Sequence, residues 1–148
     1  MTERAAALVA VEEQVQVLMR RIKRVIGERA AEVHPDLQPS SFIILGWLAE
    51  NGPARGSSLV CQFHIDKGAI SRQVQHLLDL GLAEREPDPA DGRATLVSVS
   101  ADAVAKLEAV ADERRRWLDG RLSDWSEEQL ALMVELLGRY NEALDDRD

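Results

Sequence analysis

Cysteine, aromatic residues and long hydrophobic runs are all scarce in this chain of 148 residues. The single cysteine, Cys61, has no partner for a disulfide within the chain, which excludes a disulfide-held fold and fits a reducing compartment. No apolar run approaches the roughly 18–20 residues that cross a bilayer, and Met1–Ala10 lacks the cationic start and apolar stretch of a signal peptide. We therefore expect a soluble, cytoplasmic protein that does not contact a membrane.

The sequence motifs of common enzymes are missing as well. The chain has no Gly-rich phosphate loop, no H-E-x-x-H and no G-x-S-x-G, and nothing ties its histidines to a nucleophile. Cys61, His64 and Asp66 resemble a fragment of a metal site, but no fourth ligand lies nearby in the sequence. We expect no catalysis, no cofactor and no bound metal.

An excess of basic residues, which is typical of domains that bind nucleic acids, is also missing, because the net charge is −8. The charge is distributed unevenly: residues 1–65 carry 0, residues 66–100 carry −2 and residues 101–148 carry −6. Most of the excess acid lies in the last third, so the charge does not exclude a DNA-binding function for the middle of the chain.

The composition that remains is that of an ordinary globular protein. Hydrophobic residues make up 45% and charged residues 30%, which excludes collagen-like, low-complexity and wholly disordered chains. A chain of this length buries a core without disulfides, and no repeat or linker divides it. We expect a single domain over residues 1–148.

Each end of the chain shows a helix with a narrow apolar seam. The seam residues are Leu8, Val11, Val15, Leu18, Ile22 and Val25 near the start, and Leu130, Met133, Leu137, Tyr140 and Leu144 near the end. Their spacings of three and four residues place each set along one face of a helix. A seam this narrow suits packing against one or two neighbours, as in a bundle or at a dimer interface.

Three shorter helices are predicted between these ends. The first opens at Pro39, is apolar almost all round and ends at Asn51, so it should lie at the centre of the domain. The second spans residues 55–63. The third runs from Asp66, a good N-cap, to Gly81, a natural C-cap.

After Gly81 the pattern changes to strands over Leu82–Glu86 and Ala94–Ser100, with turn-forming and charged residues over 87–93. Two helices joined by a tight turn and followed by a hairpin form a winged helix-turn-helix, whose second helix enters the DNA major groove. The predicted fold class is therefore mainly α with a small β-hairpin wing, and residues 38–100 form the winged helix-turn-helix lobe.

The helix after Asp66 has the faces of a recognition helix. Ile70, Val74 and Leu77 fall on one side, and the opposite side is almost free of acid. Arginine pairs with guanine edges and glutamine with adenine edges, while serine and lysine hold phosphates. The predicted DNA contacts are Lys67, Ser71, Arg72, Gln73, Gln75 and His76 on this helix, with Ser57 and Ser58 on the helix before it.

The chain resembles the MarR family of winged-helix transcriptional regulators over nearly its whole length. The resemblance is carried by residues 70–85, by Asp88, Asp91, Gly92 and Arg93, and by residues 96–100. It implies that Arg93 reaches the minor groove from the wing tip and that Asp88 and Asp91 orient it. Many relatives carry a second cation beside this arginine, where the chain has Gly92. The resemblance also implies a homodimer, with residues 1–34 and 101–148 as interlocking dimerisation helices.

The function that this resemblance implies is sequence-specific binding of double-stranded DNA. We expect a dimeric transcriptional repressor on a pseudo-palindromic operator, released by a small-molecule effector. Arg24, His34, Trp47 and Trp117 are conceivable effector contacts, although both tryptophans are more typical of a core. The alternative is a helical dimer that acts through protein contacts without DNA binding. Retention on heparin or DNA resin at low salt distinguishes the two functions.

Overall fold

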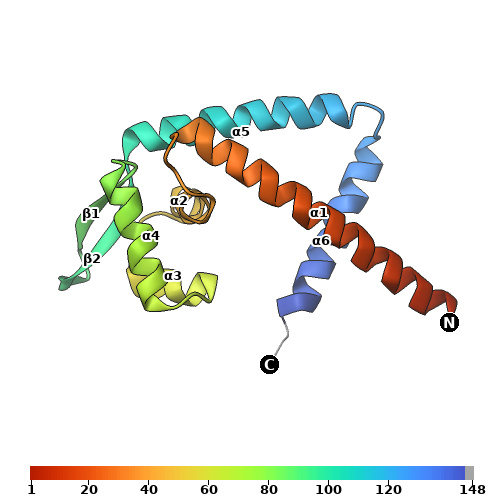
Figure 1. Cartoon of the computed structure of the whole chain (residues 1–148), viewed down its shortest axis with the longest axis horizontal. Coiled ribbons are helices and arrows are strands. Elements are labelled where there is room, and N and C mark those ends of the chain that lie inside the picture. Colours follow the sequence, from red (N-terminus) through yellow and green to blue (C-terminus); the bar gives the residue numbers. More distant parts are fainter. Residues whose placement is uncertain (146–148) are drawn as a thin grey trace. The chain divides into compact units, whose positions relative to one another are not determined.

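The computed structural model describes residues 1–145, and the chain divides into two compact units, Met1–Val110 and Ala111–Asp148. The described residues form six helices and one antiparallel hairpin (Figure 1). This confirms the predicted fold class, mainly α with a β-hairpin wing. The predicted single domain and its internal boundaries remain predictions.

Helix α1 (Glu3–Val33) is 31 residues long and is buried only at its last turn, at Ala30 and Val33. It begins before the apolar seam does, because the Thr2 hydroxyl accepts a hydrogen bond from the Ala5 N–H at 3.2 Å and caps the helix. It ends at Val33, since His34 precedes a proline and adopts an extended conformation.

Helices α2 (Pro39–Asn51), α3 (Gly56–Phe63) and α4 (Lys67–Asp79) enclose the core of the first unit. Helix α2 contacts α1, α4 and the hairpin, so it holds the predicted central position, although Ile43 is 44% exposed. The buried apolar core consists of Ala30, Val33, Leu37, Ile44, Leu45, Leu48, Ala54, Leu59, Ile70, Val74, Leu77, Leu82, Ala83, Val97 and Ala103.

Strands β1 (Ala83–Asp88) and β2 (Asp91–Val99) form the wing. The predicted turn over residues 87–93 is too long, because Pro87 and Thr95 are paired and Asp88 lies opposite Asp91. A proline is tolerated here because a two-stranded sheet leaves each strand one unpaired edge. The turn is therefore reduced to Pro89 and Ala90.

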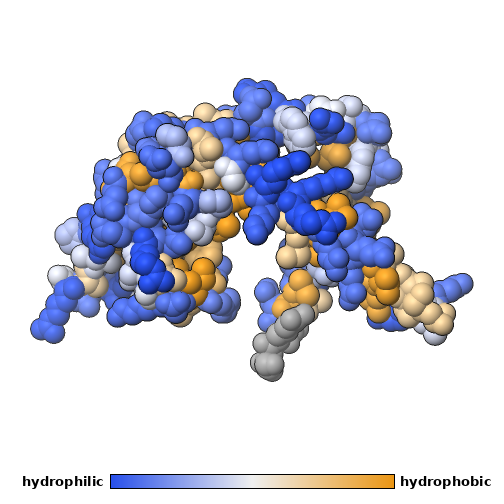
Figure 2. Space-filling view, in the orientation of Figure 1, coloured by the Kyte–Doolittle hydropathy of each residue, from blue (hydrophilic) through white to orange (hydrophobic). Residues whose placement is uncertain are grey.

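Helix α5 (Ala101–Arg121) begins in the first unit, and α6 (Glu127–Asp145) lies in the second. A capping box precedes α6: the Gln129 N–H donates to Ser126 Oγ at 3.1 Å, and the Ser126 N–H donates to Gln129 Oε1 at 2.9 Å. No residue of α6 is buried. Hydrophobic residues reach the surface along the N-terminal half of α1 and along α6 (Figure 2).

Candidate nucleic-acid interface

Helix α4 presents the polar face that its sequence predicts. Asp66 caps it by accepting a hydrogen bond from the Ala69 N–H at 2.9 Å. Ile70, Val74 and Leu77 are buried, so the opposite side of the helix is left to solvent. The exposed residues on α4 that were predicted to contact DNA are Lys67, Ser71, Arg72 and Gln75.

The side chain of Arg72 lies back over the first turn of α4, above Gly68. A Cβ atom at Gly68 would lie 3.4 Å from Arg72 Nη1 and 3.2 Å from Asp66 Oδ1. The missing side chain therefore leaves room for the guanidinium next to the helix N-terminus.

Gln73 and His76 are partly buried, and both contact the N-terminal end of α2. The hydroxyl of Ser41, which is fully buried, donates a hydrogen bond to Gln73 Oε1. The backbone N–H of Gln38 donates to His76 Nε2 at 3.4 Å. These two side chains attach α4 to α2, so Arg72 and Gln75 are the freer of the predicted base-reading residues.

The polar face of α4 ends at an acid. Gln75 Nε2 donates a hydrogen bond to Asp79 Oδ1 at 2.8 Å. The exposed carboxylate of Asp79 would repel phosphates. The favourable part of the helix therefore lies on the N-terminal side of Asp79.

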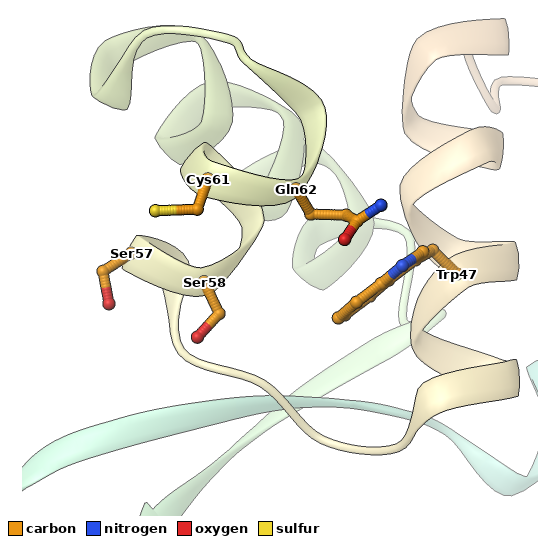
Figure 3. A pocket seen from close by; sticks show the side chains of 5 residues that line it. All are labelled: Trp47, Ser57, Ser58, Cys61 and Gln62. Atoms are coloured by element: carbon orange, nitrogen blue, oxygen red, sulfur yellow. The ribbon is translucent and has the colours of Figure 1, made fainter. Parts of the chain in front are cut away.

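Ser57 and Ser58 are exposed on the first turn of α3. Neither caps α3, because the N-cap residue is Arg55 and it makes no side-chain capping bond. Both serines border an open groove of about 460 Å³ with Trp47, Cys61 and Gln62. Figure 3 shows Gln62 above the indole of Trp47, with the thiol of Cys61 turned away from it.

Trp47 was a candidate both for the core and for an effector contact. In the structure its side chain is partly buried and packs on the core. Its ring meets that of Phe63 edge to face, with the centroids 6.1 Å apart. Trp117 is 55% exposed, and the guanidinium of Arg121 lies 5.3 Å from its ring centre. The core interpretation therefore fits Trp47 better than Trp117.

Two carboxylates shape the wing tip. Asp91 Oδ1 accepts a hydrogen bond from the Arg93 N–H at 3.0 Å, and Asp88 Oδ1 accepts one from the Ala90 N–H at 2.9 Å. Both are local turns of the kind that aspartate favours. They hold the backbone on either side of the turn and leave the Arg93 side chain exposed.

Asp88 also pairs with Arg55, a contact that the sequence did not predict. The Arg55 Nε and Nη2 atoms each lie 2.6 Å from Asp88 Oδ2. The Ala90 N–H and the Arg55 guanidinium together hold the pKa of the Asp88 carboxyl below its ordinary value of 3.8. The two residues are 33 positions apart, so no local pattern indicates the pair.

Residues 1–145 support neither a membrane-spanning helix nor a metal site. In that part of the chain, no helix is both long and apolar enough to cross a membrane. Nor does it contain a group of three or more His, Cys, Asp or Glu side chains placed to hold a metal ion. The local arrangement of Cys61, His64 and Asp66 therefore does not form such a group.

Comparison with known proteins shows a consistent set of relatives. Residues 36–94 match the model of the MarR family. The uncharacterized HTH-type transcriptional regulator YxaD of Bacillus subtilis is 34% identical over 111 residues, covering 75% of this chain and 78% of YxaD. The HTH-type transcriptional repressor NicR of Pseudomonas putida is 28% identical over 104 residues, covering 68% of this chain and 65% of NicR. The structure of a MarR family protein from Bacillus stearothermophilus shares the fold, with a TM-score of 0.72, 21% identity and 99% of both chains covered.

Proposed function

The chain belongs to the MarR family and is a DNA-binding transcriptional regulator, not an enzyme, and on this premise we propose that it works as a homodimeric repressor. In this proposal it binds a pseudo-palindromic operator in the cytoplasm, and a small molecule releases it. The name of the relative NicR supports repression. Release by a small-molecule effector follows from the family to which the chain belongs.

The observation that carries DNA binding is the exposed face of α4 on the N-terminal side of Asp79. Arg72 and Gln75 there match the donors that read guanine and adenine in the major groove. Lys67 and Ser71 flank them and suit phosphates, as do Ser57 and Ser58 on α3. Gln73 and His76 belong to the proposed contacts as well, although each already bonds to the N-terminal end of α2.

The exposed wing supports a second point of contact. Arg93 is the third residue of β2, close to the turn, and the Asp88 and Asp91 carboxylates hold the backbone around it. The minor groove is read mainly for its width and A·T content, which an inserted arginine senses. We propose that Arg93 makes this contact and that Asp88 and Asp91 orient the tip.

The apolar seams support the homodimer. In α6 the seam residues Leu130, Met133 and Leu137 are 38–41% exposed in the single chain. Apolar area of this size is stabilising only once it leaves water. Two copies of the dimerisation helices, in residues 1–34 and 101–148, would cover each other's seams.

Selection of bound fragments from random DNA, followed by footprinting, tests the proposal. A two-fold dimer should protect two half-sites about one helical turn, roughly 10 bp, apart. A single asymmetric half-site would contradict the dimeric arrangement. Failure to retain DNA at low salt would instead favour the alternative, a dimer that acts through protein contacts.

Salt dependence provides an independent measure of the same interface. Arg55 is already paired with Asp88, which leaves Lys67, Arg72, Arg85 and Arg93 as the nearby cations of each subunit. If about six of these reach phosphates in the dimer, log affinity should fall with log salt at a slope of about −5. A slope steeper than about −9 would show a basic surface that this interface does not contain.

Two alanine variants separate base reading from groove reading. Arg72→Ala should cost about 1–3 kcal/mol on the selected operator and much less on a site changed at the contacted base. Arg93→Ala should weaken binding on every core sequence and alter the preference for A·T-rich flanks. Arg115→Ala, which removes an exposed arginine paired one turn away with Asp112, is the control. Equal losses for Arg72→Ala on all DNA would reduce Arg72 to a phosphate contact.

A further inference from the structure

The hairpin is attached to the segment that leads into α3 at two points. The first is a backbone bridge, in which the Ala54 N–H donates to the Val97 carbonyl at 3.1 Å and the Val97 N–H donates to the Ala54 carbonyl at 2.8 Å. The second is the ion pair between Arg55, the next residue, and Asp88. Ala54 thus holds strand β2 of the wing, and the next residue, Arg55, holds strand β1.

Both oxygen atoms of the Asp88 carboxylate have partners. Its Oδ2 atom accepts from Nε and Nη2 of Arg55, and its Oδ1 atom accepts from the Ala90 N–H. The Asp88 side chain is only 9% exposed, whereas that of Arg55 is 41% exposed. A carboxylate this buried needs its cation, because an unpaired charge away from water is costly. The geometry therefore favours one fixed position of Asp88 relative to α3.

The two attachments lie at different distances from the wing tip. Val97 is paired with Arg85, and Asp88 lies three residues further along β1, about 10 Å nearer the turn. A single attachment at Val97 would fix the base of the hairpin and leave the tip free to pivot. The second attachment fixes its direction as well, and with it the position of Arg93.

We infer that Arg55 and Asp88 are positioning residues for DNA recognition, whose ion pair sets where Arg93 of the wing stands relative to the recognition helix α4. This inference rests on the proposed function, because it concerns how the wing arginine reaches DNA. It assigns the charge of Arg55 to Asp88 instead of to a phosphate.

A double-mutant cycle tests the inference. The affinity for the selected operator is measured with and without Arg93→Ala in three backgrounds: the unchanged chain, Arg55→Met and Asp88→Asn. In the unchanged chain Arg93→Ala should weaken binding about tenfold or more. In the other two backgrounds the same change should weaken it less than about threefold, because Arg93 has already lost its position.

Two controls separate positioning from stability. Arg72→Ala should weaken binding by the same factor in all three backgrounds, because α4 is held by Ser41 and the core and not by the ion pair. Glu86→Gln removes an exposed charge from the same strand as Asp88 and should leave the Arg93→Ala factor unchanged. Where Arg55→Met fails to fold, Arg55→Lys keeps the charge but not the forked geometry and should reduce the factor partly.

The outcomes distinguish this inference from the function on which it rests. Loss of the Arg93→Ala effect together with a retained Arg72→Ala effect supports positioning. An unchanged Arg93→Ala factor, with only a lower melting temperature, means that the pair merely stabilises the lobe and overturns the inference alone. Absence of operator binding by the unchanged chain overturns both proposals.

Discussion

Helices α4 and α6 carry the same spacing of apolar residues and differ in what covers them. In α4, Ile70, Val74 and Leu77 are at most 4% exposed, because α2, α3 and the hairpin surround them. In α6, Leu130 and Leu137 follow the same rule of three and four residues, yet they are 38% and 41% exposed. A periodic seam therefore marks an apolar face without showing whether the same chain covers it.

The largest effect is expected from a charge in the seam of α6. Leu137→Asp would place an unpaired carboxylate in the proposed dimer interface twice, at a cost of several kcal/mol for each. The dissociation constant of the dimer should rise by about a thousandfold or more, and operator binding should be lost with it. Sedimentation measures the first effect and a DNA titration the second.

Ala131→Asp is the matched control, since it adds the same charge to the same helix on the side away from the seam. It should leave the dimer intact. A stable monomer of the unchanged chain at micromolar concentration would refute the assignment of the seam to a second copy.

Truncation in the core of the first unit should have the next largest effect. Leu77→Ala removes a side chain that is 0% exposed and should lower the free energy of unfolding by about 2–5 kcal/mol. The loss should be the same at every protein concentration, because the cavity lies within one chain. Leu137→Ala should instead destabilise the protein more at low concentration than at high. Chemical denaturation at two concentrations compares them, and identical behaviour would remove the distinction between the two helices.

Helix caps provide a smaller and more local comparison. Asp66→Ala and Ser126→Ala each remove an N-cap, and each should cost about 1 kcal/mol. Only Asp66→Ala should also weaken operator binding, because it frees the N-terminus of the recognition helix beside Arg72. An equal loss of DNA affinity in both variants would show that the cap of α4 has no special part in recognition.

The smallest expected effect is a change in folding stability at acidic pH. Because the pKa of Asp88 is lower in the folded protein than its ordinary value of 3.8, its ion pair stabilises the fold above that pH. The stabilisation should be lost as pH falls through the lowered pKa, so the difference in stability between the unchanged chain and Asp88→Asn should narrow below about pH 4. Glu113→Gln, which breaks an exposed pair with Arg116, should show little difference at any pH. Urea unfolding over a pH series measures both, and a constant gap for Asp88→Asn would contradict this account.

Local signals predicted many features of the fold. Asp66 as N-cap, Gly81 after α4 and the Ser126–Gln129 capping box are present because each depends on hydrogen bonds or backbone angles within a few residues. The start of α1 and the length of the turn were predicted less well. A Thr2 cap extends α1 beyond its seam, and strand pairing continues into the turn-forming residues after Glu86.

The contacts that side chains of α4 and of the wing make depend on partners far away in the sequence. The residue types and their spacing were enough to predict a recognition helix followed by a wing, because periodicity and turn chemistry act over short distances. Only the packed structure directs Gln73 and His76 to α2 and Arg55 to Asp88. These contacts join residues 32 to 38 positions apart, and a charge or an amide selects such a partner only after the core has brought the two segments together.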